Sequence, residues 1–147
     1  MLILRRMPEV ERFCSRIERL EAITCTSHYS KAMKYEERPW GSYQIIHVDQ
    51  KCQVKKLVVN PGKRLSLQSH RYRAEHWFVV SGMGIAQVDS EIIPLQPGDS
   101  VDIPILAKHR ITCGGEDALI FIEVQTGTSF DEMDIVRFED DFGRATI

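Results

Sequence analysis

The chain has 147 residues, of which 43% are hydrophobic and 27% charged, and its formal net charge is -2. That length suits one domain with its own core, and the near-neutral charge argues against nucleic-acid binding, which usually needs a basic surplus. No apolar run approaches the roughly 20 residues of a membrane-spanning helix, and the N-terminus does not resemble a signal peptide. Because the four cysteines form no C-x-x-C pair, we expect reduced thiols in a cytoplasmic protein.

The first predicted element is an amphipathic helix over residues 8–22. Apolar side chains recur there at intervals of three and four residues, at Val10, Phe13, Ile17 and Leu20. A polar linker over residues 24–37 completes a predicted N-terminal segment, residues 1–37. We expect a homodimer, because a two-fold pairing would bury the apolar stripe. The alternative is a monomer whose helix folds back on the rest of its own chain.

Residues 38–147 form the second predicted unit. Runs rich in β-branched and aromatic residues cover 43–48, 54–59, 77–80, 85–88 and 118–124. Turn formers such as Asn60-Pro61-Gly62 and Gln96-Pro97-Gly98 separate these runs. Many short strands at this spacing predict an all-β fold, either an antiparallel sandwich or a barrel.

Two segments of this unit carry candidate metal ligands. Alternate side chains of a strand share a face, so Gln68 and His70 should point to the same side, and Glu75 begins the next strand. The second segment, residues 98–109, ends at His109. Two imidazoles, a carboxylate and an amide oxygen suit zinc or another first-row transition metal better than calcium. We therefore predict one divalent metal ion, with zinc as the first choice, bound by Gln68, His70, Glu75 and His109.

These segments resemble the paired motifs of the cupin superfamily. The first motif is represented by Gly62, Gln68, His70, Glu75 and Gly82. The second is represented by Gly98, Pro104, Leu106, His109 and Cys113. Three positions depart from the family pattern: Gln68 replaces a histidine, Leu106 a glycine and Cys113 an asparagine. The resemblance implies a double-stranded β-helix, or jelly-roll barrel, around a metal ion.

Further runs are similar to type II mannose-6-phosphate isomerase, over residues 38–144. They are Arg38-Pro39-Trp40-Gly41, Arg73-Ala74-Glu75-His76-Trp77, Glu123-Val124-Gln125 and the closing segment 134–144. In that family this unit is often the C-terminal half of a bifunctional enzyme with a mannose-1-phosphate guanylyltransferase. No glycine-rich phosphate loop precedes residue 38, so we expect a free-standing isomerase domain. The implied reaction interconverts mannose 6-phosphate and fructose 6-phosphate through an enediol(ate).

The resemblance also marks Arg73 as catalytic. Since a guanidinium stays protonated, we expect Arg73 to stabilise the enediolate rather than to act as a base. Glu123, on a late strand, is the candidate for proton transfer. The substrate phosphate calls for cationic side chains, and the candidates are Lys56, Arg64, Arg137 and Arg144.

Three of these phosphate candidates, Arg137, Arg144 and Lys56, have an alternative. Arg137 and Arg144 belong to the family's closing motif, but they could instead form surface ion pairs with the acidic run at residues 139–141. Lys55 adjoins Lys56, so one lysine should face inward and the other outward.

Two other functions remain open from the sequence. One is a different metal-dependent cupin sugar isomerase or epimerase, and the other is a non-catalytic sugar-binding cupin. The predicted ligand set favours a metal enzyme over a binding protein. The run from Arg73 to Trp77 and the pair Arg137 and Arg144 favour the isomerase.

Overall fold

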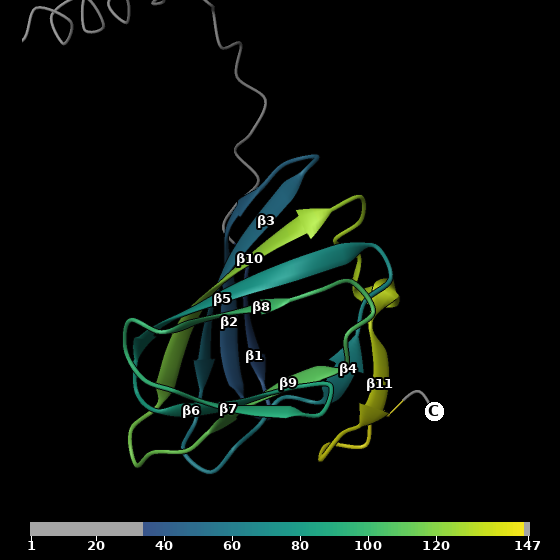
Figure 1. Ribbon diagram of the computed structural model, residues 1–147. Coiled ribbons are helices and arrows are strands. Elements are labelled where there is room, and N and C mark those ends of the chain that lie inside the picture. Colours follow the sequence, from purple (N-terminus) through teal and green to yellow (C-terminus); the bar gives the residue numbers. More distant parts are fainter. Residues whose placement is uncertain (1–33, 146–147) are drawn as a thin grey trace, which may run out of the picture. The chain divides into compact units, whose positions relative to one another are not determined.

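Figure 1 shows the computed structural model, which describes residues 34–145. All the strand pairs within it are antiparallel, and they form two sheets, with strand orders β1-β2-β3-β10-β5-β8 and β11-β4-β9-β6-β7. The elements are β1 (Tyr35–Arg38), β2 (Gly41–Val48), β3 (Cys52–Val59), β4 (Leu67–Ser69), β5 (Arg73–Ser81), β6 (Gly84–Val88), β7 (Glu91–Leu95), β8 (Ser100–Ile103), β9 (His109–Cys113), β10 (Leu119–Gly127), the 3-10 helix η1 (Glu132–Asp134) and β11 (Val136–Glu139).

The all-β fold predicted from the sequence is confirmed, and the five predicted runs lie in β2, β3, β5, β6 and β10. The first sheet begins at Tyr35, inside the segment predicted to be a linker, because β1 pairs with β2 there. The helix predicted over residues 8–22 lies outside the described residues. Within residues 34–145, no helix is both long and apolar enough to cross a membrane.

The interior between the two sheets is apolar at one end and polar at the other. On β5, the face that buries Trp77 and Val79 also carries Glu75, because side chains alternate along a strand. On β10, the face that buries Phe121 also carries Glu123. A fully buried large apolar side chain contributes about 1.5–3 kcal/mol, and such burial offsets the cost of enclosing the polar end.

The turn between β8 and β9 has an unusual backbone. The Ala107 N–H bonds to the Pro104 carbonyl at 3.2 Å, and Leu106, the third residue of the turn, has φ +71°. A positive φ at this place normally requires glycine, which is the residue that the cupin motif has here. The Leu106 N–H also donates to the His70 carbonyl at 2.8 Å, so this turn connects the regions of two candidate ligands.

Candidate metal centre

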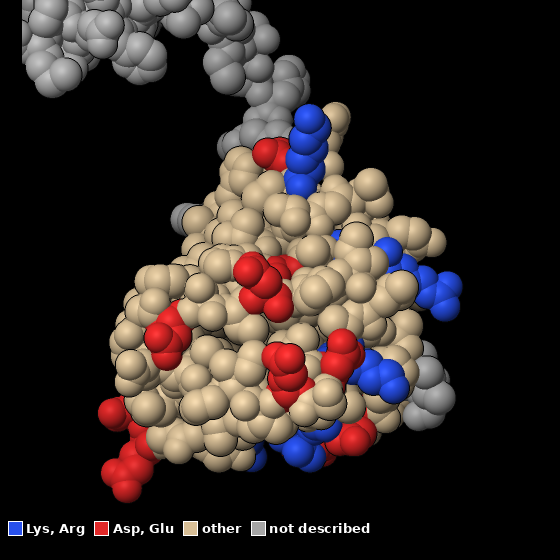
Figure 2. All heavy atoms as spheres, in the orientation of Figure 1, with Lys and Arg blue, Asp and Glu red and all other residues tan. Residues whose placement is uncertain are grey.

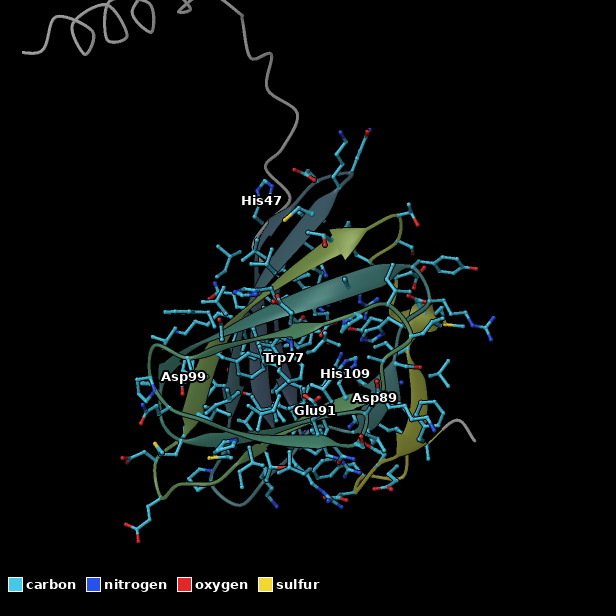
Figure 3. The ribbon with its side chains drawn as sticks, viewed as in Figure 1. His47, Trp77, Asp89, Glu91, Asp99 and His109 are labelled. Carbon is cyan, nitrogen blue, oxygen red and sulfur yellow. The ribbon has the colours of Figure 1, made fainter. Side chains whose placement is uncertain are left out.

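Three predicted ligands meet between the sheets. His70 follows β4, Glu75 lies on β5 and His109 begins β9, and each is at most 4% exposed. Glu75 Oε1 lies 3.1 Å from His70 Nε2, and Glu75 Oε2 lies 3.6 Å from His109 Nε2. Ligands about 2.1 Å from one ion are about 3–3.5 Å from each other, so these distances suit a shared metal. In Figure 3, His109 and Trp77 both point into the space between the sheets.

His109 is prepared to act as a ligand. Its Nδ1 lies 2.9 Å from the Ala107 carbonyl, which can only accept, so Nδ1 carries the proton and Nε2 keeps its lone pair. Nε2 is buried and has no hydrogen-bond partner among the described residues. Burial lowers the pKa of His109 despite the nearby Glu75 carboxylate, which favours the neutral form that binds metals. A buried acceptor without a donor is costly, and a divalent metal ion would satisfy it.

Gln68 lies beside both histidines of the triad. It pairs directly with His109 across β4 and β9, and its Nε2 lies 3.5 Å from His70 Nε2. Its Oε1 accepts a hydrogen bond from the Ser66 hydroxyl at 2.8 Å. Since that hydroxyl can accept as well as donate, the amide can turn to present its oxygen to an ion. The structure therefore places Gln68 at the site, and its role as a ligand stays a prediction.

Glu75 is surrounded by donors. Gln125 Nε2 donates to Oε1 at 3.0 Å, Trp77 Nε1 donates to Oε2 at 3.1 Å, and Arg73 Nε lies 3.4 Å from Oε1. Burial on its own would raise the pKa of Glu75. The neighbouring His70, His109 and Arg73 oppose burial and hold this pKa well below its usual range. The carboxylate therefore stays ionised, as a metal ligand must.

A second buried carboxylate, Glu123, lies beside Glu75. Both side chains line one cavity. Burial and the charge of Glu75 raise the pKa of Glu123 to about 8, although Lys55, with Nζ 3.9 Å from Glu123 Oε1, acts in the opposite direction. Glu123 thus faces the cavity, as the alternation of β10 predicts.

The same cavity is lined by five cationic side chains: Arg38, Lys55, Arg73, Arg137 and Arg144. Arg144 also binds Asp140 at 2.6 Å, so for this residue the predicted cavity position and the alternative ion pair coexist. Burial, aided by the charge of Arg144, lowers the pKa of Arg137. The two arginines add positive charge to the cavity, part of which Asp140 offsets.

Two predicted phosphate ligands lie elsewhere. Lys56 is exposed on the outer face of β3, and the inward lysine of the pair is Lys55, which is 9% exposed. Arg64 forms an exposed ion pair with Asp141 at 2.8 Å, outside the cavity. Sequence reasoning missed Arg38, because no strand was predicted there. The only signal for it was the Arg38-Pro39-Trp40-Gly41 run, which carried the family resemblance without suggesting a role.

Comparison of the whole fold with solved structures finds cupins. An RmlC-like cupin from Shewanella frigidimarina superposes with a TM-score of 0.62 at 20% identity, over 74% of this chain and 95% of that chain. CapF, a capsular polysaccharide assembling protein from Staphylococcus aureus, gives a TM-score of 0.64 at 25% identity, over 78% and 36% of the two chains. The barrel is therefore a cupin double-stranded β-helix.

Sequence relatives place the chain more narrowly. The xanthan biosynthesis protein XanB of Xanthomonas campestris is 42% identical over 95% of this chain, and the alginate biosynthesis protein AlgA of Pseudomonas fluorescens is 47% identical over 74%. The matches span only 29% and 23% of those longer proteins. The family model described as "Mannose-6-phosphate isomerase C-terminal" matches residues 26–140. This chain therefore belongs to the mannose-6-phosphate isomerase C-terminal family.

Proposed function

We propose that this chain is a metal-dependent aldose–ketose isomerase that interconverts mannose 6-phosphate and fructose 6-phosphate. One observation carries the proposal: a single cavity brings together Glu75 of the candidate metal triad, a second carboxylate with a raised pKa, and a group of arginines. An isomerase of a phosphorylated sugar needs a site for each of these tasks, namely holding two sugar oxygens, moving a proton and binding a phosphate.

The proton transfer is assigned to Glu123. Isomerisation moves a proton between C1 and C2 of the sugar through an enediol(ate). With a pKa of about 8, the Glu123 carboxyl group can both take up and release a proton near neutral pH. Arg73 stays protonated and would donate to the negative charge that develops on the sugar oxygens. A divalent ion bound by the triad would supply Lewis-acid polarisation of the carbonyl.

The phosphate is assigned to the arginines of the C-terminal segment and β1. Arg137, Arg144 and Arg38 line both the cavity and an adjoining surface groove, which marks them as its mouth. Figure 2 shows several basic side chains on the side of the molecule where η1 and β11 lie in Figure 1. A phosphate dianion would relieve the repulsion between Arg137 and Arg144 and accept hydrogen bonds from both. The sugar would then extend toward Glu75 and Glu123.

The proposal extends to the identity of the metal ion and to the cellular compartment of the protein. Zinc suits a nitrogen and oxygen ligand set, and we propose it as the bound ion. Cys52 and Cys113 are both free thiols, which agrees with a reducing compartment such as the cytoplasm.

A coupled assay of fructose 6-phosphate conversion to mannose 6-phosphate, with and without a chelator, tests the proposal. We expect turnover that the chelator abolishes and that added Zn²⁺ restores, with about one metal ion per chain. His70→Ala together with His109→Ala should remove most of the metal, whereas His47→Ala, at an exposed position far from the interior, should change nothing.

The results also separate the alternatives. Full metal occupancy in the double variant would refute the metal centre. Turnover of a different sugar phosphate would point to another cupin isomerase or epimerase, and phosphosugar binding without turnover of any sugar would point to a sugar-binding cupin.

A further inference from the structure

A buried amide links the two carboxylates of the cavity. Gln125, which is 1% exposed, donates from Nε2 to Glu123 Oε1 at 2.7 Å and to Glu75 Oε1 at 3.0 Å. The other oxygens of both carboxylates accept from Trp77 Nε1, at 3.1 Å for Glu75 and 3.2 Å for Glu123. Each carboxylate is therefore fixed at both of its oxygens.

A third buried residue sets the direction of this amide. Gln53, which is 6% exposed, donates from Nε2 to Gln125 Oε1 at 2.9 Å. A carbonyl oxygen can only accept, so this bond turns the NH₂ group of Gln125 toward the carboxylates. In the register of the sheet, Gln53 lies opposite Gln125, and Gln125 lies opposite Glu75. The three side chains therefore form one row across β3, β10 and β5.

We propose that Gln125, oriented by Gln53, is the positioning residue that presents Glu75 to the metal ion. This inference rests on the metal site of the proposed function. A buried carboxylate turns toward its strongest donors, and Arg73 Nε lies 3.4 Å from the same Oε1 that Gln125 holds. Without Gln125, Trp77 Nε1 still holds Glu75, but only through Oε2. Oε1 can then turn into a closer ion pair with Arg73, away from the triad.

Zinc affinity of the full chain, measured in competition with a chromophoric chelator, tests this role without any sugar. Gln125→Leu keeps the volume and removes the donors, and it should weaken Zn²⁺ binding about 10- to 100-fold, the usual effect of losing the partner of a metal ligand. Gln53→Leu should weaken binding by a smaller factor, because it frees only the orientation of the amide. Gln87→Leu, at a partly exposed glutamine of β6, is the matched control and should leave affinity unchanged.

A double-mutant cycle separates positioning from general loosening of the core. If Gln53 acts through Gln125, then Gln53→Leu should cause no further loss of affinity in the Gln125→Leu background. The absorption spectrum of the Co²⁺-loaded protein should change with Gln125→Leu and stay the same with Gln87→Leu. Circular dichroism of each metal-free variant verifies the fold, and if Gln125→Leu does not fold, Gln53→Leu must still weaken Zn²⁺ binding relative to Gln87→Leu.

Wild-type affinity in Gln125→Leu, or additive losses in the double variant, would overturn this inference and leave the proposed function standing. Failure of the unmodified chain to bind Zn²⁺ or Co²⁺ would overturn both.

Discussion

Leu106 adopts a strained backbone conformation that the fold tolerates. Its φ of +71° belongs to the region that favours glycine. The residue is 63% exposed, so burial of its side chain contributes little to stability. A non-glycine residue in this conformation costs about 1–2 kcal/mol. The turn persists because its backbone bonds to His70, at the metal centre.

Leu106→Gly should stabilise the protein by about 0.5–1 kcal/mol, because relief of the backbone strain exceeds the added freedom of glycine in the unfolded chain. Urea unfolding measures the change, with Leu106→Ala as the control. Alanine keeps the strain and the Cβ atom, so its free energy of unfolding should match that of the unmodified protein. A glycine variant less stable than the alanine variant would show that the turn is not strained.

Arg73 is the second residue whose identity matters. Its guanidinium donates to the Asp131 carbonyl at 3.0 Å and approaches both Glu75 and His70. Arg73→Lys keeps the charge but loses the planar fork, and we expect turnover to fall about 100-fold while metal content and fold are retained. Arg71→Lys, at the exposed neighbouring arginine, is the control. Near-normal turnover of Arg73→Lys would make this residue peripheral to the reaction.

At the scale of elements, β11 connects the phosphate end of the cavity to the metal end. It pairs with β4, and Arg137 lies directly opposite Gln68. A displacement of β11 would therefore move a candidate phosphate ligand and a candidate metal ligand together. The arginine that follows this strand, Arg144, lines the same cavity.

Arg144→Ala should raise the KM for the phosphosugar about 10- to 100-fold, since a charge-assisted hydrogen bond contributes about 1.5–3 kcal/mol. Inhibition by free phosphate should weaken in parallel. Arg64→Ala removes a comparable arginine–aspartate pair outside the cavity and should leave KM unchanged. Equal competition by unphosphorylated and phosphorylated sugars would contradict the phosphate assignment.

The end of β11 and the two residues that follow it are also predicted to respond to acid. Three consecutive carboxylates bond to arginines: Glu139 to Arg110, Asp140 to Arg144 and Asp141 to Arg64. These hydrogen bonds lower the pKa of each carboxylate. Their stabilisation is therefore complete above the unfolded pKa values near 4 and is lost as the pH falls through the lower folded values.

We expect the β11 amides to exchange hydrogen faster below about pH 4, after correction for intrinsic rates, while the β10 amides stay protected. Hydrogen exchange at pH 3.5 and pH 6 measures the difference, and equal protection of β11 at both values would contradict it.

At the scale of the whole molecule, the homodimer stays a prediction. It rests on the apolar stripe of residues 8–22, which lies outside the described residues. Light scattering of the full chain should give a dimer, and Ile17→Asp, which places a charge in that stripe, should shift it toward the monomer. Glu18→Lys, at a predicted outward position, is the control. A full chain that scatters as a monomer would refute the prediction.

The all-β fold could be predicted from local alternation along the strands, and the metal centre from the spacing of the two cupin-like motifs. The period of two along a strand places Glu75 and Trp77 on one face, whichever strand lies beside them. The sequence spacing from Gln68 to Glu75 is likewise the same whichever strands lie beside this segment. Among the strands that escaped prediction, which include β8, β9 and β11, β7 was missed because Pro94 interrupts its pattern, and β1 because a short, charged run resembles a linker.

The amino-acid sequence by itself thus determined the all-β class, and its resemblance to the cupin motifs gave the barrel and the candidate ligands Gln68, His70, Glu75 and His109. Only the tertiary structure decided that Lys55 and Arg38 enter the cavity while Lys56 and Arg64 stay outside it. Only the register of three strands could align Gln53, Gln125 and Glu75 in one row. The physical reason is that alternation acts within a strand, whereas a cavity is built from strands far apart in the chain, whose register is set by packing of the entire core.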